Sequence, residues 1–287
     1  MPKAHDSRTI PEVQETSVWT PPDGALGRLI SKALERAALT TPAVLADFRA
    51  RAAALPPAQG FADALRKAGG VAVIAEVKRR SPSKGALNPL ISAPARAAEY
   101  VAGGAAALSI LTEPSEFGGN ISDLIDVHRQ VHVPLLRKDF HVHESQVWEA
   151  RVAGASALLL IARALEPSRL EALVGEAMEA GLEPLIEVRS TAELDLALRL
   201  GASLIGINAR DLETLAIEPE VVEQLLPRVP ADRLAIAESG LGGVADLERL
   251  AARGANAVLV GSHLSLSEDG AAAVRALVGV PRQGRAA

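Results

Sequence analysis

Short aliphatic runs alternate with longer amphipathic stretches along most of the chain from residue 71 onward. The aliphatic runs have the length of buried strands and lie at residues 71–78, 105–111, 133–138, 156–162, 183–188, 203–208, 234–238 and 256–261. Such runs, separated by helix-length segments, are typical of βα units, in which helices connect parallel strands. Eight units in one chain predict an α/β fold of the (βα)8 TIM barrel type.

An internal repeat marks the ends of alternate helices. The segments GGAAALSI, GASALLLI, GASLIGIN and GANAVLVG begin at Gly103, Gly154, Gly201 and Gly254. Glycine is favoured just beyond a helix because it adopts positive φ without strain, so we interpret each of these glycines as the C′ residue that ends a helix. The S-x-x-E pattern predicts capping boxes at two helix starts, at Ser168 with Glu171 and at Ser190 with Glu193.

An open, doubly wound sheet is the competing architecture for the same alternation. It predicts a G-x-G-x-x-G turn after the first strand, whereas this chain has SPSKG at residues 81–85. That segment also lacks the G-x4-G-K spacing of a P-loop. The barrel is therefore favoured, and we interpret SPSKG as a βα loop that contacts the substrate.

The predicted barrel occupies residues 61–280 and forms a single catalytic domain. Residues 1–60 are expected to form an N-terminal extension with helices over 26–38 and 42–54, capping the barrel at its N-terminal side or rim. Residues 281–287 form a short polar tail that is expected to fray.

Composition narrows the possible partners and the compartment. The net charge is −5 and no basic run is present, which argues against nucleic acid as a partner. The apolar runs are shorter than the roughly 20 residues that span a bilayer, and the first residues lack a secretory signal, so no membrane association is expected. The absence of cysteine removes thiolate and disulfide chemistry and is compatible with a cytoplasmic location.

Charged residues interrupt the first strand near its end, where a barrel builds its active site. By the two-residue period, Ile74, Glu76 and Lys78 share one face, and the other face is aliphatic. We therefore expect Glu76 and Lys78 to point into the barrel mouth. Burying both charges is unfavourable unless they pair or bind a ligand, so a purely structural ion pair is the alternative.

Later strand ends supply further acids and bases. Lys138 ends the third strand with inward parity, and burial beside other cations is expected to lower its pKa, which suits a general acid. Its neighbour Arg137 is expected to face a helix instead. Glu187 in the fifth strand and Asn208 at the end of the sixth complete a set suited to proton transfer.

Small residues follow the last two strands, where these barrels commonly bind phosphate. They are Ser239 and Gly240 after the seventh strand, and Gly261 and Ser262 after the eighth. Their backbone N–H groups are open to an anion, although glycine and serine are also ordinary turn residues. The paired placement favours a site for a small phosphorylated substrate.

His141 and His143 have the spacing of a metal-binding pair. Barrel hydrolases that use such a pair carry it on the first strand, with further histidines on later strands, and strands five and six here have none. We therefore expect no metal, and we interpret both histidines as loop or helix-start residues.

Six motifs in order give the chain a resemblance to the indole-3-glycerol phosphate synthase family of tryptophan biosynthesis. They are VIAEVKRRSPSKG from Val73, LLRKDF from Leu135, LIEV from Leu185, GINARDL from Gly206, AESGL from Ala237 and VGS from Val260. The resemblance spans roughly residues 60–265. It implies a lyase that closes 1-(2-carboxyphenylamino)-1-deoxyribulose 5-phosphate to an indole with loss of CO2 and water. It implies no cofactor, and association with other tryptophan-pathway enzymes is possible but not required.

The resemblance also implies a role for each matching residue. Lys138 would be the general acid, Glu187 the base in dehydration, Lys78 the partner of the substrate carboxylate, and Glu76 the residue that holds the lysines. The other implied contacts are Asn208 and Ser239 for the ring and hydroxyls, Ser81 and Arg210 for the substrate, Gly240, Gly261 and Ser262 for phosphate, and Phe117, Phe140, Leu212 and Leu259 for the aromatic ring. Which lysine acts at which step stays open.

Two other functions compete with this interpretation. Phosphoribosylanthranilate isomerase, another barrel of the same pathway, uses a cysteine base, which this chain lacks. A non-catalytic phosphate-binding barrel would keep the loops at Gly240 and Gly261. It would not need Lys78, Lys138 and Glu187 together.

Overall fold

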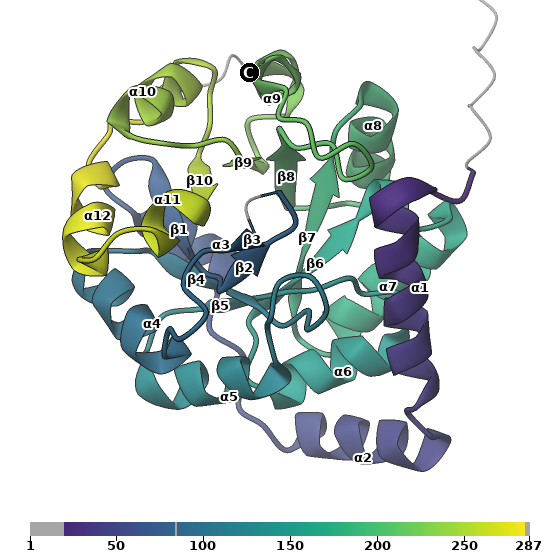
Figure 1. Ribbon diagram of the computed structural model, residues 1–287. Helices are drawn as coiled ribbons and strands as arrows, with labels where there is room; N and C mark the ends of the chain where they lie inside the picture. Colours follow the sequence, from purple (N-terminus) through teal and green to yellow (C-terminus); the bar gives the residue numbers. More distant parts are fainter. Residues whose placement is uncertain (1–19, 84, 285–287) are drawn as a thin grey trace, which may run out of the picture.

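The computed structural model describes residues 20–83 and 85–284 and contains a closed barrel of parallel strands (Figure 1). Around the barrel the strand order is β1-β10-β9-β8-β7-β6-β5-β4. The strand bounds are β1 Ala72–Val77, β4 Ala107–Leu111, β5 Leu135–Lys138, β6 Ala157–Ile161, β7 Glu183–Val188, β8 Leu204–Asn208, β9 Leu234–Glu238 and β10 Ala257–Val260. Each lies within a run expected from the sequence, so the (βα)8 prediction is confirmed.

A ring of helices covers the outside of the barrel (Figure 1). Their bounds are α4 Ala93–Ala102, α5 Ile121–Gln130, α6 Glu144–Val152, α7 Pro167–Glu179, α8 Thr191–Arg199, α9 Pro219–Leu225, α10 Val244–Ala252, α11 Ser262–Ser265 and α12 Gly270–Leu277, with 3-10 turns η1 Ala162–Ala164 and η2 Leu226–Arg228. Because the barrel strands are covered on both sides, almost all of their residues are buried. Among the described helices, none is long and apolar enough to cross a membrane.

Helix ends follow the predicted pattern with two corrections. Gly154, Gly201 and Gly254 have φ of 94°, 76° and 92°, as expected of caps. At the first repeat the left-handed residue is Gly104, with φ of 99°, whereas Gly103 keeps a helical φ of −77°. The prediction for Gly103 was therefore wrong by one residue.

The two predicted capping boxes differ in outcome. Ser190 is the N-cap of α8 and accepts a hydrogen bond from the backbone N–H of Glu193 at 3.2 Å, as expected. The Glu193 carboxylate accepts from the backbone N–H of Arg189 at 2.8 Å, one residue before the predicted Ser190. The box at Ser168 was wrong, because α7 begins at Pro167 and its N-cap is Glu166, two residues before Ser168. Proline is preorganised for the first helical position and displaces the serine from the cap.

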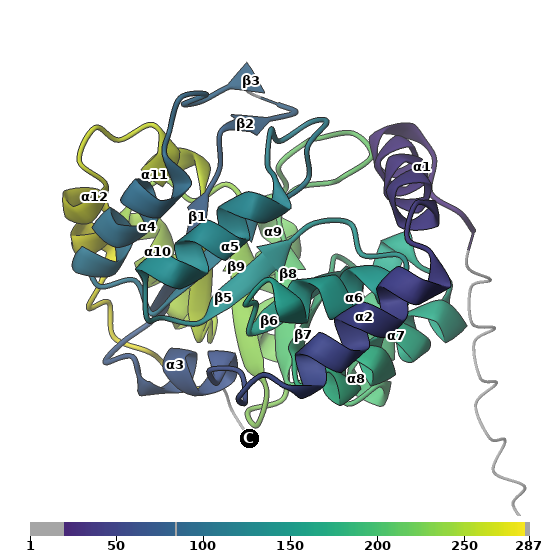
Figure 2. The same ribbon diagram turned by 90° about the horizontal axis from the view of Figure 1, so that it is seen from below.

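Three helices precede the first strand, α1 Gly24–Ala38, α2 Pro42–Ala53 and α3 Phe61–Lys67. Helix α1 lies at the end of the barrel that also carries a short hairpin, β2 Arg80–Ser81 and β3 Gly85–Ala86 (Figure 2). Helix α2 packs beside α6, and α3 lies at the opposite end of the barrel. Residues 1–19 of the predicted extension lie outside the described residues.

The chain ends are held at the α3 end of the barrel. Val71 donates its backbone N–H to the carbonyl of Val280 at 2.8 Å. The guanidinium of Arg282 donates to the carbonyls of Leu65 and Arg66. The tail predicted to fray thus makes contacts with α3 at Arg282, and residues 285–287 lie outside the described part of the chain.

Candidate active site

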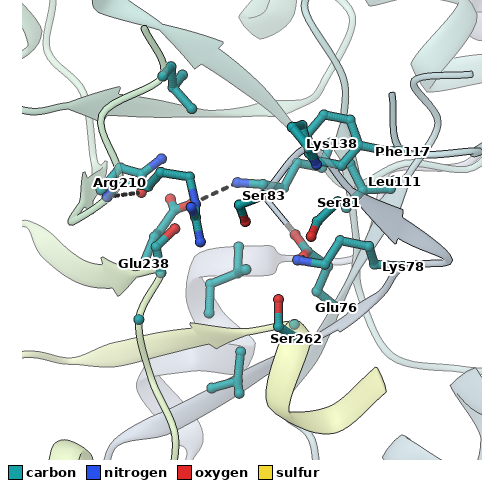
Figure 3. Close-up of a pocket in the computed structure, with 18 of the residues that line it drawn as sticks. Glu76, Lys78, Ser81, Ser83, Leu111, Phe117, Lys138, Arg210, Glu238 and Ser262 are labelled. Atoms are coloured by element: carbon teal, nitrogen blue, oxygen red, sulfur yellow. Dashed lines mark hydrogen bonds and ion pairs between the residues drawn. The ribbon is translucent and has the colours of Figure 1, made fainter. Parts of the chain in front are cut away.

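One cavity of about 410 Å³ opens at the carboxyl ends of the barrel strands, and Figure 3 shows part of its lining. It brings together every residue that the sequence analysis assigned to the site: Glu76, Lys78, Ser81, Phe117, Lys138, Phe140, Glu187, Asn208, Arg210, Leu212, Ser239, Gly240, Leu259, Gly261 and Ser262. These side chains come from strands and loops around the whole barrel, so the closure of the sheet assembles them.

The first strand contributes an ion pair to this cavity. Lys78 Nζ lies 2.7 Å from Glu76 Oε1, and both residues line the cavity as the strand parity predicts (Figure 3). The carboxylate is almost fully buried, while the lysine side chain keeps 11% exposure. The pair is therefore placed so that the ammonium can also meet a ligand.

A second lysine lies between two buried carboxylates. Lys138 Nζ is 2.7 Å from Glu238 Oε2 and 3.6 Å from Glu187 Oε2. The two glutamates come from β9 and β7, and both side chains are at most 3% exposed. One ammonium thus faces two carboxylates, which leaves this cluster with an excess negative charge when all three groups are ionised.

The electrostatics of Lys138 differ from the sequence-based expectation. Burial lowers the pKa of Lys138, but the attraction of Glu238, Glu187 and Glu76 outweighs it, so the pKa is raised above its ordinary value. The expected fall toward neutral pH was wrong because the neighbours are carboxylates, not cations. Burial raises the pKa of Glu238 to about 7, against the opposing attraction of Lys138.

Glu238 is a site residue that the sequence analysis missed. The motif AESGL drew attention to Ser239 and Gly240, while Glu238 was passed over as the end of the strand. The signal was nevertheless present, because Glu76, Glu187 and Glu238 each follow aliphatic residues near the end of a strand. A carboxylate in that position is unfavourable without a partner, which points to the active site.

The candidate phosphate site lies beside these charges. Ser239 and Gly240 have consecutive positive φ values of 69° and 73°. Positive φ is uncommon for a serine, so this turn is sharply specified by its surroundings. Gly261 and Ser262 directly follow the neighbouring strand, β10, and lie at the start of the short helix α11. Both turns therefore border the same side of the cavity.

Aromatic and aliphatic side chains form the apolar wall of the cavity. The rings of Phe117 and Phe140 lie with their centroids 6.5 Å apart and tilted by 39°. Leu212 and Leu259 also line the cavity, and Leu29 of α1 adds a contact that the sequence analysis did not anticipate. The sequence carried no signal for Leu29, because nothing local places α1 over the barrel mouth.

Asn208, at the end of β8, and Arg210, in the loop after it, are held by hydrogen bonds within this segment. Asn208 accepts a hydrogen bond through Oδ1 from the backbone N–H of Arg210 at 2.9 Å. The Arg210 guanidinium donates to the carbonyl of Leu215 at 2.8 Å and borders the cavity. Both side chains are therefore fixed in orientation before any ligand binds.

Arg137, His141 and His143 do not line the cavity, and their side chains make contacts within the fold. Arg137 faces α6, as expected, and donates to the carbonyl of Gln146 at 2.9 Å. His143 is the N-cap of α6, which confirms the helix-start interpretation. His141 is buried, with Nδ1 2.7 Å from the carbonyl of Leu159, and burial together with Arg137 lowers its pKa to about 3. Among the described residues, no group of three His, Cys, Asp or Glu side chains is placed to hold a metal ion.

Comparison with known sequences agrees with the family resemblance of the six motifs. The family model for indole-3-glycerol phosphate synthase matches residues 28–277. The indole-3-glycerol phosphate synthase of a Nocardioides species is 49% identical over 236 residues, covering 82% of this chain and 90% of that protein. Indole-3-glycerol phosphate synthase 1 of Streptomyces coelicolor is 47% identical over 234 residues, covering 82% and 87%.

Solved structures with low identity resemble the barrel alone. The 3-hexulose-6-phosphate synthase from Salmonella typhimurium has a TM-score of 0.59 at 13% identity and covers 72% of this chain and 96% of its own. Thiamine phosphate pyrophosphorylase from Pyrococcus furiosus has a TM-score of 0.54 at 15% identity, with coverage of 72% and 93%. The match of the family model over most of the barrel, together with relatives at nearly half identity, shows that the chain belongs to the indole-3-glycerol phosphate synthase family.

Proposed function

We propose that the chain closes 1-(2-carboxyphenylamino)-1-deoxyribulose 5-phosphate to indole-3-glycerol phosphate, with release of CO2 and water. The observation that carries this proposal is the convergence of Lys78, Lys138 and Glu187 in one cavity, between an apolar wall and two glycine-containing turns. The substrate has a matching order of parts: an aromatic acid, a ketose and a phosphate.

The cavity supports one orientation of this substrate. The phosphate is assigned to Gly240, Gly261 and Ser262, which line the cavity and whose backbone N–H groups could bind an anion. The aromatic ring is assigned to the wall made by Phe117, Phe140, Leu212 and Leu259. The ketose carbonyl then falls in the middle of the cavity, near the lysines and their carboxylates.

In the proposed first step, the ring carbon that bears the carboxylate attacks the ketose carbonyl. Lys138 donates a proton to the carbonyl oxygen, which becomes a hydroxyl group. Attack leaves the ring cationic, and Glu76, Glu187 and Glu238 provide negative charge around it. Loss of CO2 returns the electron pair of the broken C–C bond to the ring and restores its aromaticity.

In the proposed second step, the hydroxyl leaves as water with a proton from an ammonium group. Glu187 takes the proton from the carbon next to the anilino nitrogen as the indole double bond forms. Lys78 binds the substrate carboxylate in the first step and is available as an acid in the second. Holding Lys78 in position is the role assigned to Glu76, whose Oε1 lies 2.7 Å from Lys78 Nζ.

The remaining assignments concern orientation of the substrate. Asn208 and Ser239 are assigned to the substrate hydroxyls and the ring nitrogen, because both residues line the cavity. Ser81 and Arg210 are assigned further contacts at the rim. The proposed reaction requires only the small phosphorylated substrate and no partner enzyme.

The proposal is tested by following indole absorbance or fluorescence with the purified chain and this substrate. Lys138→Ala and Glu187→Gln should each lower kcat by at least about 10²-fold, the usual contribution of a positioned acid or base. Lys67→Ala, at the end of α3 and far from the cavity, is the matched control and should behave as wild type. Absence of product with the folded wild-type chain would reject the function. A variant within a few-fold of wild type would remove that residue from its role.

A further inference from the structure

Gly206 lies on β8 directly beneath the carboxylate of Glu238. A Cβ atom placed on Gly206 would fall well inside van der Waals contact with Glu238 Oε1 and would lie 2.8 Å from Leu185 Cδ2. Gly206 is also the register partner of Glu187 on β7. The glycine therefore sits between the two carboxylates that flank Lys138.

We propose that Gly206 is a positioning residue, whose lack of a side chain allows the Glu238 carboxylate to reach Lys138. This inference rests on the proposed function, because Lys138 is the assigned acid. It adds a residue that touches neither the substrate nor the lysine.

The contacts of Glu238 explain why the position of its carboxylate depends on residue 206 having no Cβ atom. Oε2 of Glu238 accepts the 2.7 Å hydrogen bond from Lys138, while Oε1 is buried and has no hydrogen-bond partner among the described residues. Nothing but packing against Gly206 and its neighbours therefore holds the second oxygen. A methyl group at 206 would push the carboxylate toward the open cavity and away from Nζ.

The fold should tolerate this change. Gly206 is not among the glycines with positive φ, so alanine fits its backbone conformation. The three atoms nearest to such a Cβ all belong to the side chains of Glu238 and Leu185, and none belongs to the backbone. The displacement is thus expected to fall on the carboxylate and not on the strand.

The other lysine has the same arrangement. A Cβ on Gly261 of the neighbouring strand end would collide with Glu76 Oε1 and lie 2.8 Å from Lys78 Nζ. Each lysine–carboxylate pair therefore lies against a glycine from a neighbouring segment: Gly206 on β8 for Glu238, and Gly261 directly after β10 for Glu76. Gly206 is the better test position, because Gly261 is also assigned to phosphate.

The test is a double-mutant cycle between Gly206→Ala and Glu238→Ala, read by kcat, KM and the pH dependence of kcat. Gly206→Ala should lower kcat by about 10- to 10²-fold and change the pH profile in the direction that Glu238→Ala does, with KM within about 3-fold. In the Glu238→Ala background, Gly206→Ala should lower kcat by less than about 3-fold. Gly175→Ala in α7, where a Cβ meets nothing within 4 Å, is the matched control and should keep wild-type kcat.

Equal losses in both backgrounds, or a folded Gly206→Ala variant with wild-type kcat and pH profile, would overturn the inference. If Gly206→Ala does not fold but Gly206→Ala/Glu238→Ala does, the collision with Glu238 is still the cause. If neither folds, the need for glycine lies elsewhere and the inference fails.

Failure of the proposed function can be distinguished from failure of the inference about Gly206. If the wild-type chain forms no product, the cycle is read instead from the melting temperature between pH 5 and 8. The contribution of Glu238 to the pH dependence of this temperature should then be altered by Gly206→Ala and left unchanged by Gly175→Ala. The same contribution in both variants would overturn the inference.

Discussion

At the scale of single residues, the site depends on how one ammonium is shared between carboxylates. Lys138 lies within 3.6 Å of both Glu187 and Glu238, and their attraction keeps it protonated. Burial leaves Glu238 with a pKa of about 7, so this residue gains or loses its proton near neutral pH. The charge of the cluster therefore changes in the range where the enzyme is expected to work, without discharging the lysine.

This raised pKa predicts a pH-dependent stability that Glu238→Gln should remove. The native state keeps the Glu238 proton up to about pH 7, while an unfolded glutamate loses it near 4.5, so the native state binds more protons in between. The free energy of unfolding of wild type, relative to Glu238→Gln, should fall by roughly 1–3 kcal/mol between pH 5 and 8. Urea denaturation at both pH values measures this difference. Parallel pH dependence in the two proteins would contradict the raised pKa.

At the scale of elements, α1 joins the two loops that carry the aromatic wall. Arg36 binds Asp139 at 2.8 Å, next to Phe140, and Glu113 at 3.5 Å. Glu113 in turn accepts a hydrogen bond from the backbone N–H of Phe117 at 3.2 Å. A helix far from the barrel strands in sequence thus braces the loops after β4 and β5.

Arg36→Met should therefore affect both stability and substrate binding. It leaves two buried carboxylates without one of their cationic partners, and it should lower the free energy of unfolding by about 1–3 kcal/mol. KM should rise several-fold because Phe117 and Phe140 lose their support. Lys32→Met on the same helix is the control, since its pair with Glu116 is exposed and should contribute less than about 1 kcal/mol. Equal effects of the two substitutions in urea melts and KM would argue against the brace.

At the scale of the whole molecule, the two ends of the barrel have separate tasks. The end with β2, β3 and α1 holds the cavity, whereas the opposite end is closed by α3 and the C-terminal segment (Figure 2). Val280 is buried there and accepts the N–H of Val71, which leads into the first strand. The segment that ends at Val280 therefore stabilises the start of β1.

Two truncations should separate these contributions. Removal of residues 281–287 deletes the Arg282 hydrogen bonds and should lower the free energy of unfolding by about 1 kcal/mol. Removal of residues 280–287 also deletes the buried Val280 and its contact with Val71. It should lower the free energy of unfolding by a further amount of about 2–4 kcal/mol. Denaturant melts measure both, and kcat of the folded proteins should stay near wild type because the cavity lies at the other end. Indistinguishable stabilities would show that Val280 is not a closing residue.

The sequence by itself determined the eight strands, their inward faces and the family. These follow from local periodicity: a two-residue alternation sets Glu76, Lys78 and Lys138 toward the barrel axis wherever the strand is placed. Motifs after the strands likewise assigned most cavity residues to one end. The local signals were less reliable at helix ends, where Glu166 and Gly104 took the roles predicted for Ser168 and Gly103.

Only the tertiary structure decided how these residues act on one another. It placed Glu238 against Lys138 across about 100 residues of chain, raised the pKa of that lysine instead of lowering it, and brought Leu29 into the cavity. It also showed that Gly206 makes room for Glu238. Such effects depend on distances between segments remote in sequence, and strand register and packing alone set those distances.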